Sequence, residues 1–156
     1  MKVNIAKVIV AGLMIGFALM VADAQTRPDL NGTWKLDRVE SKFLNPDRAP
    51  KDLVVRFEQR GEILRETLTV LNSGGKSTVS LNYALDGKEN LNNVEGEKIT
   101  TTAKWSGNVL VLEWKDDGGT FTRRITFSDN SGTIRINVHD TNPDGEPDDL
   151  IVLGKQ

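Results

Sequence analysis

The chain has 156 residues, with 22 acidic and 20 basic side chains interspersed, a single histidine and no cysteine. The formal net charge of −2 provides no basic footprint for nucleic acid or for an anionic membrane surface. Without cysteine, disulfides and thiolate chemistry are excluded, so the fold must be stabilised by its core alone.

The first 24 residues have the three-part pattern of a secretory signal peptide. Lys2 and Lys7 precede an apolar stretch, residues 8–21, that ends before the tripeptide Ala-Asp-Ala at 22–24. This stretch is shorter than the roughly 18 to 20 apolar residues that span a bilayer. We expect cleavage after Ala24, export to a periplasm or out of the cell, and a mature domain of residues 25–156 with no stable membrane span. An uncleaved anchor is the alternative.

Residues 25–156 are predicted to form one all-β domain. Apolar residues alternate with period two between short turns rich in Gly, Asn and Asp. The nine expected strands are residues 32–37, 53–60, 63–71, 78–85, 98–105, 109–115, 120–128, 133–139 and 149–153. Residues 38–51 contain two prolines, which limit any helix there to a short or irregular turn.

Tight turns between consecutive strands favour an antiparallel up-and-down meander of about eight to ten strands, closed into a barrel because closure removes exposed sheet edges. A β-sandwich is the alternative. The rows expected to face inward are Leu53/Val55/Phe57, Leu64/Leu68/Val70, Val79/Leu81/Tyr83/Leu85, Ile99/Thr101/Ala103/Trp105, Leu110/Leu112/Trp114, Phe121/Ile125/Phe127 and Ile134/Ile136/Val138.

Three short motifs carry a family resemblance. Residues 31–37 read Asn-Gly-Thr-Trp-Lys-Leu-Asp, residues 85–88 Leu-Asp-Gly-Lys, and residues 103–110 Ala-Lys-Trp-Ser-Gly-Asn-Val-Leu. Together they resemble small exported bacterial lipocalin-like proteins, which have a calycin-type β-barrel. The resemblance implies that Trp34 closes one end of a barrel that holds a small ligand. The connection from 38 to 52 is too short for the two-helix lid of fatty-acid-binding proteins, so the ligand class is not carried over.

Two charged residues, Glu66 and Arg123, interrupt the inward rows. A charge on an inward face must be paired or solvated. One hypothesis is that Arg123 binds the acidic head group of an amphipathic ligand, as interior arginines of fatty-acid-binding proteins do, with Glu66 in the same site and the ligand tail against Tyr83, Trp105 and Trp114. The favoured alternatives are an internal pair between the two charges, with a structural role only, and a one-residue shift of register that turns either outward.

The acidic segment 140–149 offers a second candidate site. Asp140, Asn142, Asp144 and Asp148 occupy the first, third, fifth and ninth positions of an EF-hand-type calcium loop. The twelfth position is Ile151, where such a loop needs a bidentate acid. A wide hairpin turn is therefore the preferred interpretation, and Ca²⁺ would bind there only weakly. No other cofactor is expected.

The sequence contains no motif that fixes a catalytic activity. His139 is the lone histidine, so it cannot form a site of several histidines, and no Gly-x-Ser-x-Gly motif occurs. We therefore expect a protein that is not an enzyme and that binds a small apolar or amphipathic ligand in its barrel. The alternative is an interaction or structural module of the cell envelope with a filled barrel. The sequence makes no prediction of oligomeric state.

Overall fold

The computed structural model describes residues 27–140 and 149–156, and this part of the chain contains ten strands and no helix. The strands are β1 (Gly32–Leu36), β2 (Asp52–Arg60), β3 (Ile63–Asn72), β4 (Gly75–Ala84), β5 (Asn90–Val94), β6 (Glu97–Ser106), β7 (Val109–Asp116), β8 (Gly119–Phe127), β9 (Thr133–Asp140) and β10 (Asp149–Lys155). Within the described ranges, no helix is long and apolar enough to cross a membrane.

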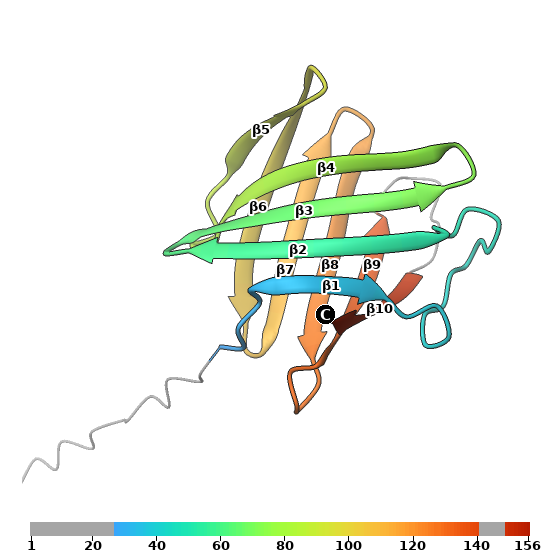
Figure 1. Ribbon diagram of the computed structural model, residues 1–156. Helices are drawn as coiled ribbons and strands as arrows, with labels where there is room; N and C mark the ends of the chain where they lie inside the picture. The colour runs from blue at the N-terminus through green and yellow to red at the C-terminus, as the bar shows by residue number, and fades with distance from the viewer. Residues whose placement is uncertain (1–26, 141–148) are drawn as a thin grey trace, which may run out of the picture.

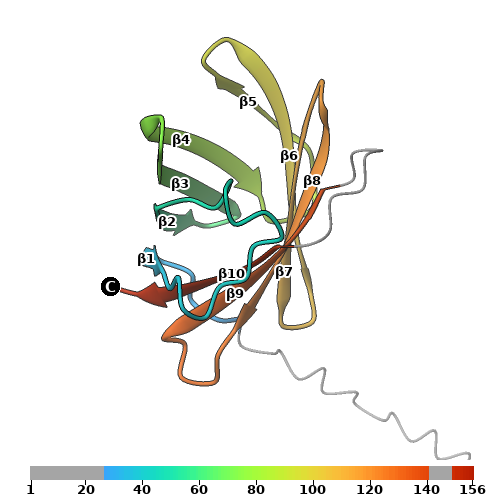
Figure 2. The same ribbon diagram turned by 90° about the vertical axis from the view of Figure 1, so that its right-hand side faces the viewer.

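All ten strands belong to one antiparallel sheet, in the order β4-β3-β2-β1-β10-β9-β8-β7-β6-β5. The first and last strands lie side by side, with Trp34 opposite Lys155. Figure 1 shows β1 to β4 crossing in front of the layer formed by β6 to β9, and Figure 2 shows the two layers curving away from each other toward β4 and β5. The predicted up-and-down β-barrel is confirmed.

The sheet is not closed by a ladder between β4 and β5, and the side chain of Asn92 bridges this seam instead. Asn92 Oδ1 accepts a hydrogen bond from the backbone N–H of Asn82 (2.8 Å), and Asn92 Nδ2 donates to the backbone carbonyl of Asn82 (3.0 Å). Asn92 Nδ2 also donates to Thr101 Oγ1, whose hydroxyl donates to the carbonyl of Asn82. A carboxamide has the donor and acceptor of a peptide group, so Asn92 replaces the missing backbone pairing.

Trp34 on β1 packs into the core, and its role in closing one end of the barrel stays a prediction. Its side chain is fully buried beside Leu30, and its indole N–H donates to the carbonyl oxygen of Leu30 (3.0 Å). The Lys155 ammonium lies 5.2 Å from the centre of the indole ring, within the range of a cation–π contact. Gly32 has φ +134°, and a Cβ there would lie 3.1 Å from Lys155 Cε. A larger residue at 32 would therefore disturb the packing of Lys155 against the Trp34 ring.

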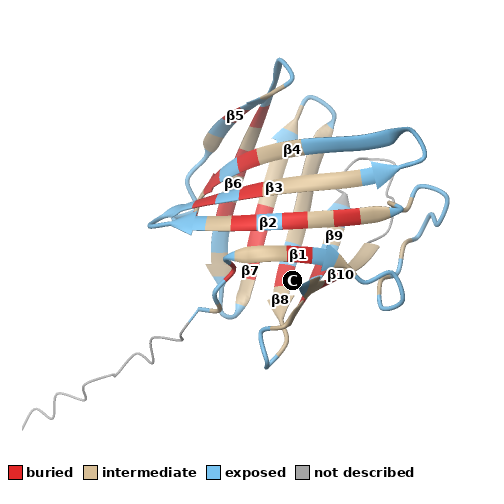
Figure 3. Ribbon diagram, viewed as in Figure 1, coloured by how far each residue is buried: buried red, intermediate tan, exposed pale blue. Residues whose placement is uncertain are grey.

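The inward rows expected from the alternating pattern form the core. Buried and partly buried members of all seven rows gather in one apolar cluster, to which Leu30, Ile151 and Leu153 also belong. Figure 3 shows the buried positions along the middle of β2 and in the strands behind it, whereas the tip of the β3–β4 hairpin, residues 71–78, is exposed. The core thus lies between the two crossing layers.

The ten strands lie within the expected eight to ten, but β5 was not among the ranges assigned from the sequence, because no apolar alternation marks it. In β5 the apolar Leu91 faces outward and is 65% exposed, whereas the polar Asn92 faces inward and is buried. The pattern is thus the reverse of that of an ordinary half-buried strand. Residues 38–51 form turns rather than a helix, in agreement with the effect expected of their prolines.

We predict that Asn92→Ala lowers the free energy of unfolding by about 1–3 kcal/mol, because the backbone groups of Asn82 lose their partners in a partly buried seam. Chemical denaturation checks this value. The matched control is Asn137→Ala at an exposed site in the middle of β9, for which a change within about 0.5 kcal/mol is expected. Equal effects of the two substitutions would contradict the role given to Asn92.

Candidate functional site

Three polar side chains meet inside the barrel: Glu66 from β3, Tyr83 from β4 and Arg123 from β8. Arg123 Nη1 donates to Glu66 Oε1 (2.7 Å), and Arg123 Nη2 donates to Glu66 Oε2 (2.6 Å). The Tyr83 hydroxyl donates to Glu66 Oε2 (2.9 Å) and accepts from Arg123 Nη2 (2.8 Å). We call these three residues the interior triad. It is the internal pair that the sequence offered as an alternative, with a tyrosine added.

The alternation of the strands brings the interior triad together. Glu66 lies opposite Leu81 on β4 and Phe57 on β2, both of which are buried. Arg123 lies opposite Leu112 and Val138 on the other layer. The two charges are 57 positions apart in the chain, so their ion pair ties the β2–β4 layer to the β7–β9 layer across the core.

Within the interior triad, burial and the neighbouring groups shift the pKa values of Tyr83 and Arg123. Burial, together with the adjacent Glu66 carboxylate, raises the pKa of Tyr83 far above its usual value, so the phenol stays neutral. Burial opposes the charged form of Arg123, but the attraction of Glu66 and Tyr83 outweighs it and raises the pKa of the guanidinium further. Glu66 and Tyr83 have no exposed surface, and the Arg123 side chain retains 13% exposure. Removing one partner of a buried pair typically costs about 3–5 kcal/mol.

A pocket lies next to the interior triad at the end of the barrel opposite Trp34. Its volume is about 250 Å³, and its barrel wall includes Phe121, Val138 and Ile151. Phe121 is two positions from Arg123 on the same face of β8, and Val138 is the cross-strand partner of Arg123. The triad therefore lies one layer of side chains below the pocket.

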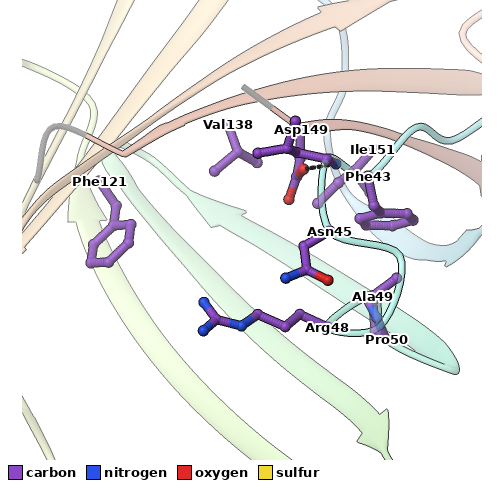
Figure 4. Close-up of a pocket in the computed structure, with 10 residues that line it drawn as sticks. Phe43, Asn45, Arg48, Ala49, Pro50, Phe121, Val138, Asp149 and Ile151 are labelled. Atoms are coloured by element: carbon purple, nitrogen blue, oxygen red, sulfur yellow. Dashed lines mark hydrogen bonds between the residues drawn. The ribbon is translucent and has the colours of Figure 1, made fainter. Parts of the chain in front are cut away.

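The connection between β1 and β2 covers this pocket. Figure 4 shows Phe43, Asn45, Ala49 and Pro50 on the side of this connection, with the side chain of Arg48 extending toward the Phe121 side. The remaining lining residues of the connection and the wall are Leu44 and Asp149.

Hydrogen bonds to β10 hold this cover in place. The backbone groups of Lys42 and Leu150 bond to each other in both directions (2.8 and 2.9 Å), and the Leu44 N–H donates to Asp149 Oδ1 (2.8 Å). Ser41 Oγ accepts from the N–H of Val152 (2.9 Å). At the start of the connection, Arg38 donates to the carbonyl oxygen of Pro50.

The structure separates the two tryptophans that the sequence assigned to one site. Trp114 packs edge-to-face on Phe121, with 5.4 Å between the ring centres, and so lies against the pocket wall. Trp105 stacks on Phe127 at 6.0 Å, under the guanidinium of Arg27, near the other end of the same strands. Tyr83 lies in the interior triad rather than on the pocket surface.

The calcium candidate lies mostly outside the described residues. Asn142, Asp144 and Asp148 are not described, and of Asp140 only the backbone, at the end of β9, is described. Among the described residues no group of three or more His, Asp or Glu side chains is placed to hold a metal ion.

The sequence did not reveal the cover of the pocket. Phe43 and Leu44 form an apolar pair inside an otherwise polar, proline-containing connection, and this is the signal that could have identified it. The contributions of Asp149 and Ile151 depend on the pairing of β10 with the β1–β2 connection, which no local pattern shows.

Comparison with solved structures establishes the fold. The chain is similar to a fatty-acid-binding protein of Schistosoma mansoni in complex with arachidonic acid (14% identity, 81% of this chain and 96% of that chain covered, TM-score 0.60). It is also similar to a secretory abundant heat soluble protein of Ramazzottius varieornatus (11%, 85% and 98%, 0.64) and to a fatty-acid-binding protein of Manduca sexta (16%, 81% and 99%, 0.53). The chain has the calycin-type β-barrel fold.

No protein-family model and no curated protein matches the chain. Identities of 11–16% to the structures above show the fold alone, because one fold hosts many unrelated functions.

The raised pKa of Tyr83 predicts a measurable resistance to alkali. Tyr83 is the only tyrosine, so all phenolate absorbance in the ultraviolet reports on it. In the unfolded chain we expect ionisation near pH 10, whereas the folded protein should show no phenolate signal there. Above about pH 10 only the unfolded state releases this proton, so the stability contributed by the neutral phenol is complete below that pH and falls as the pH rises further. Phenolate formation near pH 10 without unfolding would contradict the burial of Tyr83.

Proposed function

We propose that the protein is an exported, non-catalytic binding protein that holds a small apolar or amphipathic molecule in the mouth of its calycin barrel. The pocket between the β1–β2 connection and the wall of β8 to β10 carries this proposal, because apolar side chains line it and it opens at one end of the barrel. Ligand sites in barrels are commonly found at the mouth. Solved structures with this fold include a fatty-acid-binding protein with arachidonic acid bound.

The size of the pocket supports a modest ligand. At about 30 Å³ for each water-sized group, a volume of about 250 Å³ holds roughly eight such groups. Below the pocket the barrel is filled by the interior triad and by fully buried side chains such as Leu64, Leu112 and Ile125. A medium-length chain therefore fits better than a long one that would need the whole interior.

The chemistry of the interior supports binding rather than catalysis. Glu66, Tyr83 and Arg123 hydrogen-bond to one another inside the barrel, so their polar groups already have partners. A general acid or base must exchange its proton near the working pH. The raised pKa values of Tyr83 and Arg123 hold both groups far from that range.

We predict that compounds with about eight to ten carbons change the tryptophan fluorescence of the protein saturably, because Trp114 contacts Phe121 in the pocket wall. Val138→Phe should weaken binding about tenfold, or 1.4 kcal/mol, because it places a larger side chain in the pocket. The matched control is Val54→Phe, which adds the same bulk on the outward face of β2. A flat response across the panel would overturn this proposal and favour an interaction module of the cell envelope with a filled barrel.

Export is supported by the sequence of the first 24 residues, with their basic start, apolar stretch and small-residue end. We predict that the protein expressed from the full chain in a bacterial host is recovered outside the cytoplasm, and that its intact mass corresponds to a chain beginning at Gln25. Recovery of the full-length mass in the membrane fraction would instead show an uncleaved anchor.

A further inference from the structure

We infer that the protein self-associates through the edge of β4 that faces the seam, by antiparallel pairing with the same edge of a second copy. The backbone groups of Lys76, Thr78 and Ser80 form this edge, and we call it the free edge of β4. It lies beyond the part of the seam that Asn92 bridges, and none of its residues lines the pocket at the mouth.

The register of β3 and β4 shows which backbone groups face the seam. In an antiparallel pair, alternate residues direct both backbone groups toward the partner strand, and the residues between them direct theirs away. The N–H and C=O of Asn82 bond to the side chain of Asn92, so Asn82 faces away from β3. Ser80, Thr78 and Lys76 follow at steps of two along an unbroken register with β3. Their backbone groups therefore face the seam as well.

Side-chain contacts between β3 and β4 agree with this assignment. The hydroxyls of Thr67 and Ser80 lie 3.1 Å apart, and those of Thr69 and Thr78 lie 3.2 Å apart. Such close side chains are typical of opposite residues that exchange no backbone bonds. In the described part of the chain β4 pairs with β3 alone. The three N–H and three C=O groups of the free edge of β4 thus have no strand as a partner there.

The free edge of β4 is accessible. Residues 75–78 are exposed, and residues 79 and 80 are half-buried. Figure 2 shows the β5–β6 hairpin standing apart from this end of β4. Natural sheets often protect an edge with a proline, a bulge or an inward-facing charge. The segment 75–80, Gly-Lys-Ser-Thr-Val-Ser, has no proline, no break in its register and no charge on its inward face.

The free edge of β4 is complementary to itself. A twofold axis at Thr78 places Thr78 opposite Thr78 of the second copy, and Lys76 opposite Ser80 of the second copy. Opposite residues on facing edges exchange two backbone bonds, so every donor of the free edge meets an acceptor. Lys76 does not lie opposite its own counterpart, so the pairing opposes no like charges. The sheet then continues from β4 of one copy into β4 of the other.

Sedimentation analysis over a range of protein concentrations tests the self-association. The protein expressed from the full chain and recovered from its host should change reversibly from monomer to dimer as the concentration rises. Thr78→Pro removes the central N–H of the free edge without removing a bond to β3, and a strand edge tolerates this loss. We expect it to weaken dimerisation at least about tenfold.

The matched control is Thr78→Val, which keeps the N–H and, like proline, lacks the hydroxyl. This variant should dimerise as the wild type does. A wild-type protein that stays monomeric up to about 1 mM would overturn the inference. A folded Thr78→Pro protein that dimerises as well as Thr78→Val would overturn it too.

Single cysteines test the register, since the chain has no cysteine of its own. Thr78→Cys places the cysteines of two copies opposite each other, at a Cα separation of about 5.5 Å, which is within the range of disulfides. Lys76→Cys is the matched control on the same edge, because its counterpart is displaced along the pairing. Oxidation should give a covalent dimer of the first variant and not of the second. Equal crosslinking of both would overturn the twofold pairing at Thr78.

Amide hydrogen exchange of the wild-type protein keeps the inference testable if Thr78→Pro fails to fold. The N–H groups of Lys76, Thr78 and Ser80 should exchange rapidly at low protein concentration and become protected as the dimer forms. The N–H groups of Ser77 and Val79 face β3 and should be protected throughout. Free-edge amides that stay unprotected in a dimer would place the contact elsewhere and overturn the inference. Protection of these amides in the monomer would show that the chain covers its own edge, and would also overturn it.

Discussion

The buried bond between Glu66 and Arg123 is the constraint on which the interior of this barrel depends. Two charges are removed from water, and the bidentate geometry and the hydroxyl of Tyr83 compensate for the lost hydration. Because the partners come from opposite layers, the relative position of β3 and β8 is fixed within the reach of one guanidinium.

The carboxamide of Asn92 likewise joins two strands, at the seam between β4 and β5. Asn92 supplies the donor and the acceptor that a neighbouring strand would have supplied to Asn82. In the interior and at the seam, polar groups with their hydrogen bonds satisfied fix how the strands are arranged. Apolar packing alone would leave this arrangement less defined. Both sets of groups are buried or partly buried, and each has several partners.

The sequence predicts most of the fold because the alternation of apolar residues is a local property. The rows on β2 and β7 can be recognised in a few residues, and the Gly and Asn turns between strands limit how the strands pair. β5 could not be found in this way, since Asn92 faces inward and Leu91 outward, and the reason for this inversion is a partner ten positions earlier in the chain. The presence of Glu66 and Arg123 on inward faces was also visible in the pattern.

What the sequence could not show is the partnership between distant elements. The pairing of Glu66 with Arg123 was one of several alternatives until the curvature of the sheet brought β3 and β8 together. The cover of the pocket depends on contacts between residues 41–44 and β10, more than 100 positions later. Trp105 and Trp114 occupy the same face of neighbouring strands, yet they lie at opposite ends, which alternation alone does not distinguish.

The position of β10 between β1 and β9 has a consequence for how the chain folds. The strand formed by the last residues completes the sheet beside one of the first, with the N–H of Gln156 bonded to the carbonyl of Thr33. The pairings of β10 with β1 and with β9 therefore cannot form until β10 has been synthesised. Topologies with such distant contacts fold slowly. Until β10 pairs, the sheet stays open between β1 and β9, and the β1–β4 strands are not joined to the β6–β9 strands by backbone hydrogen bonds.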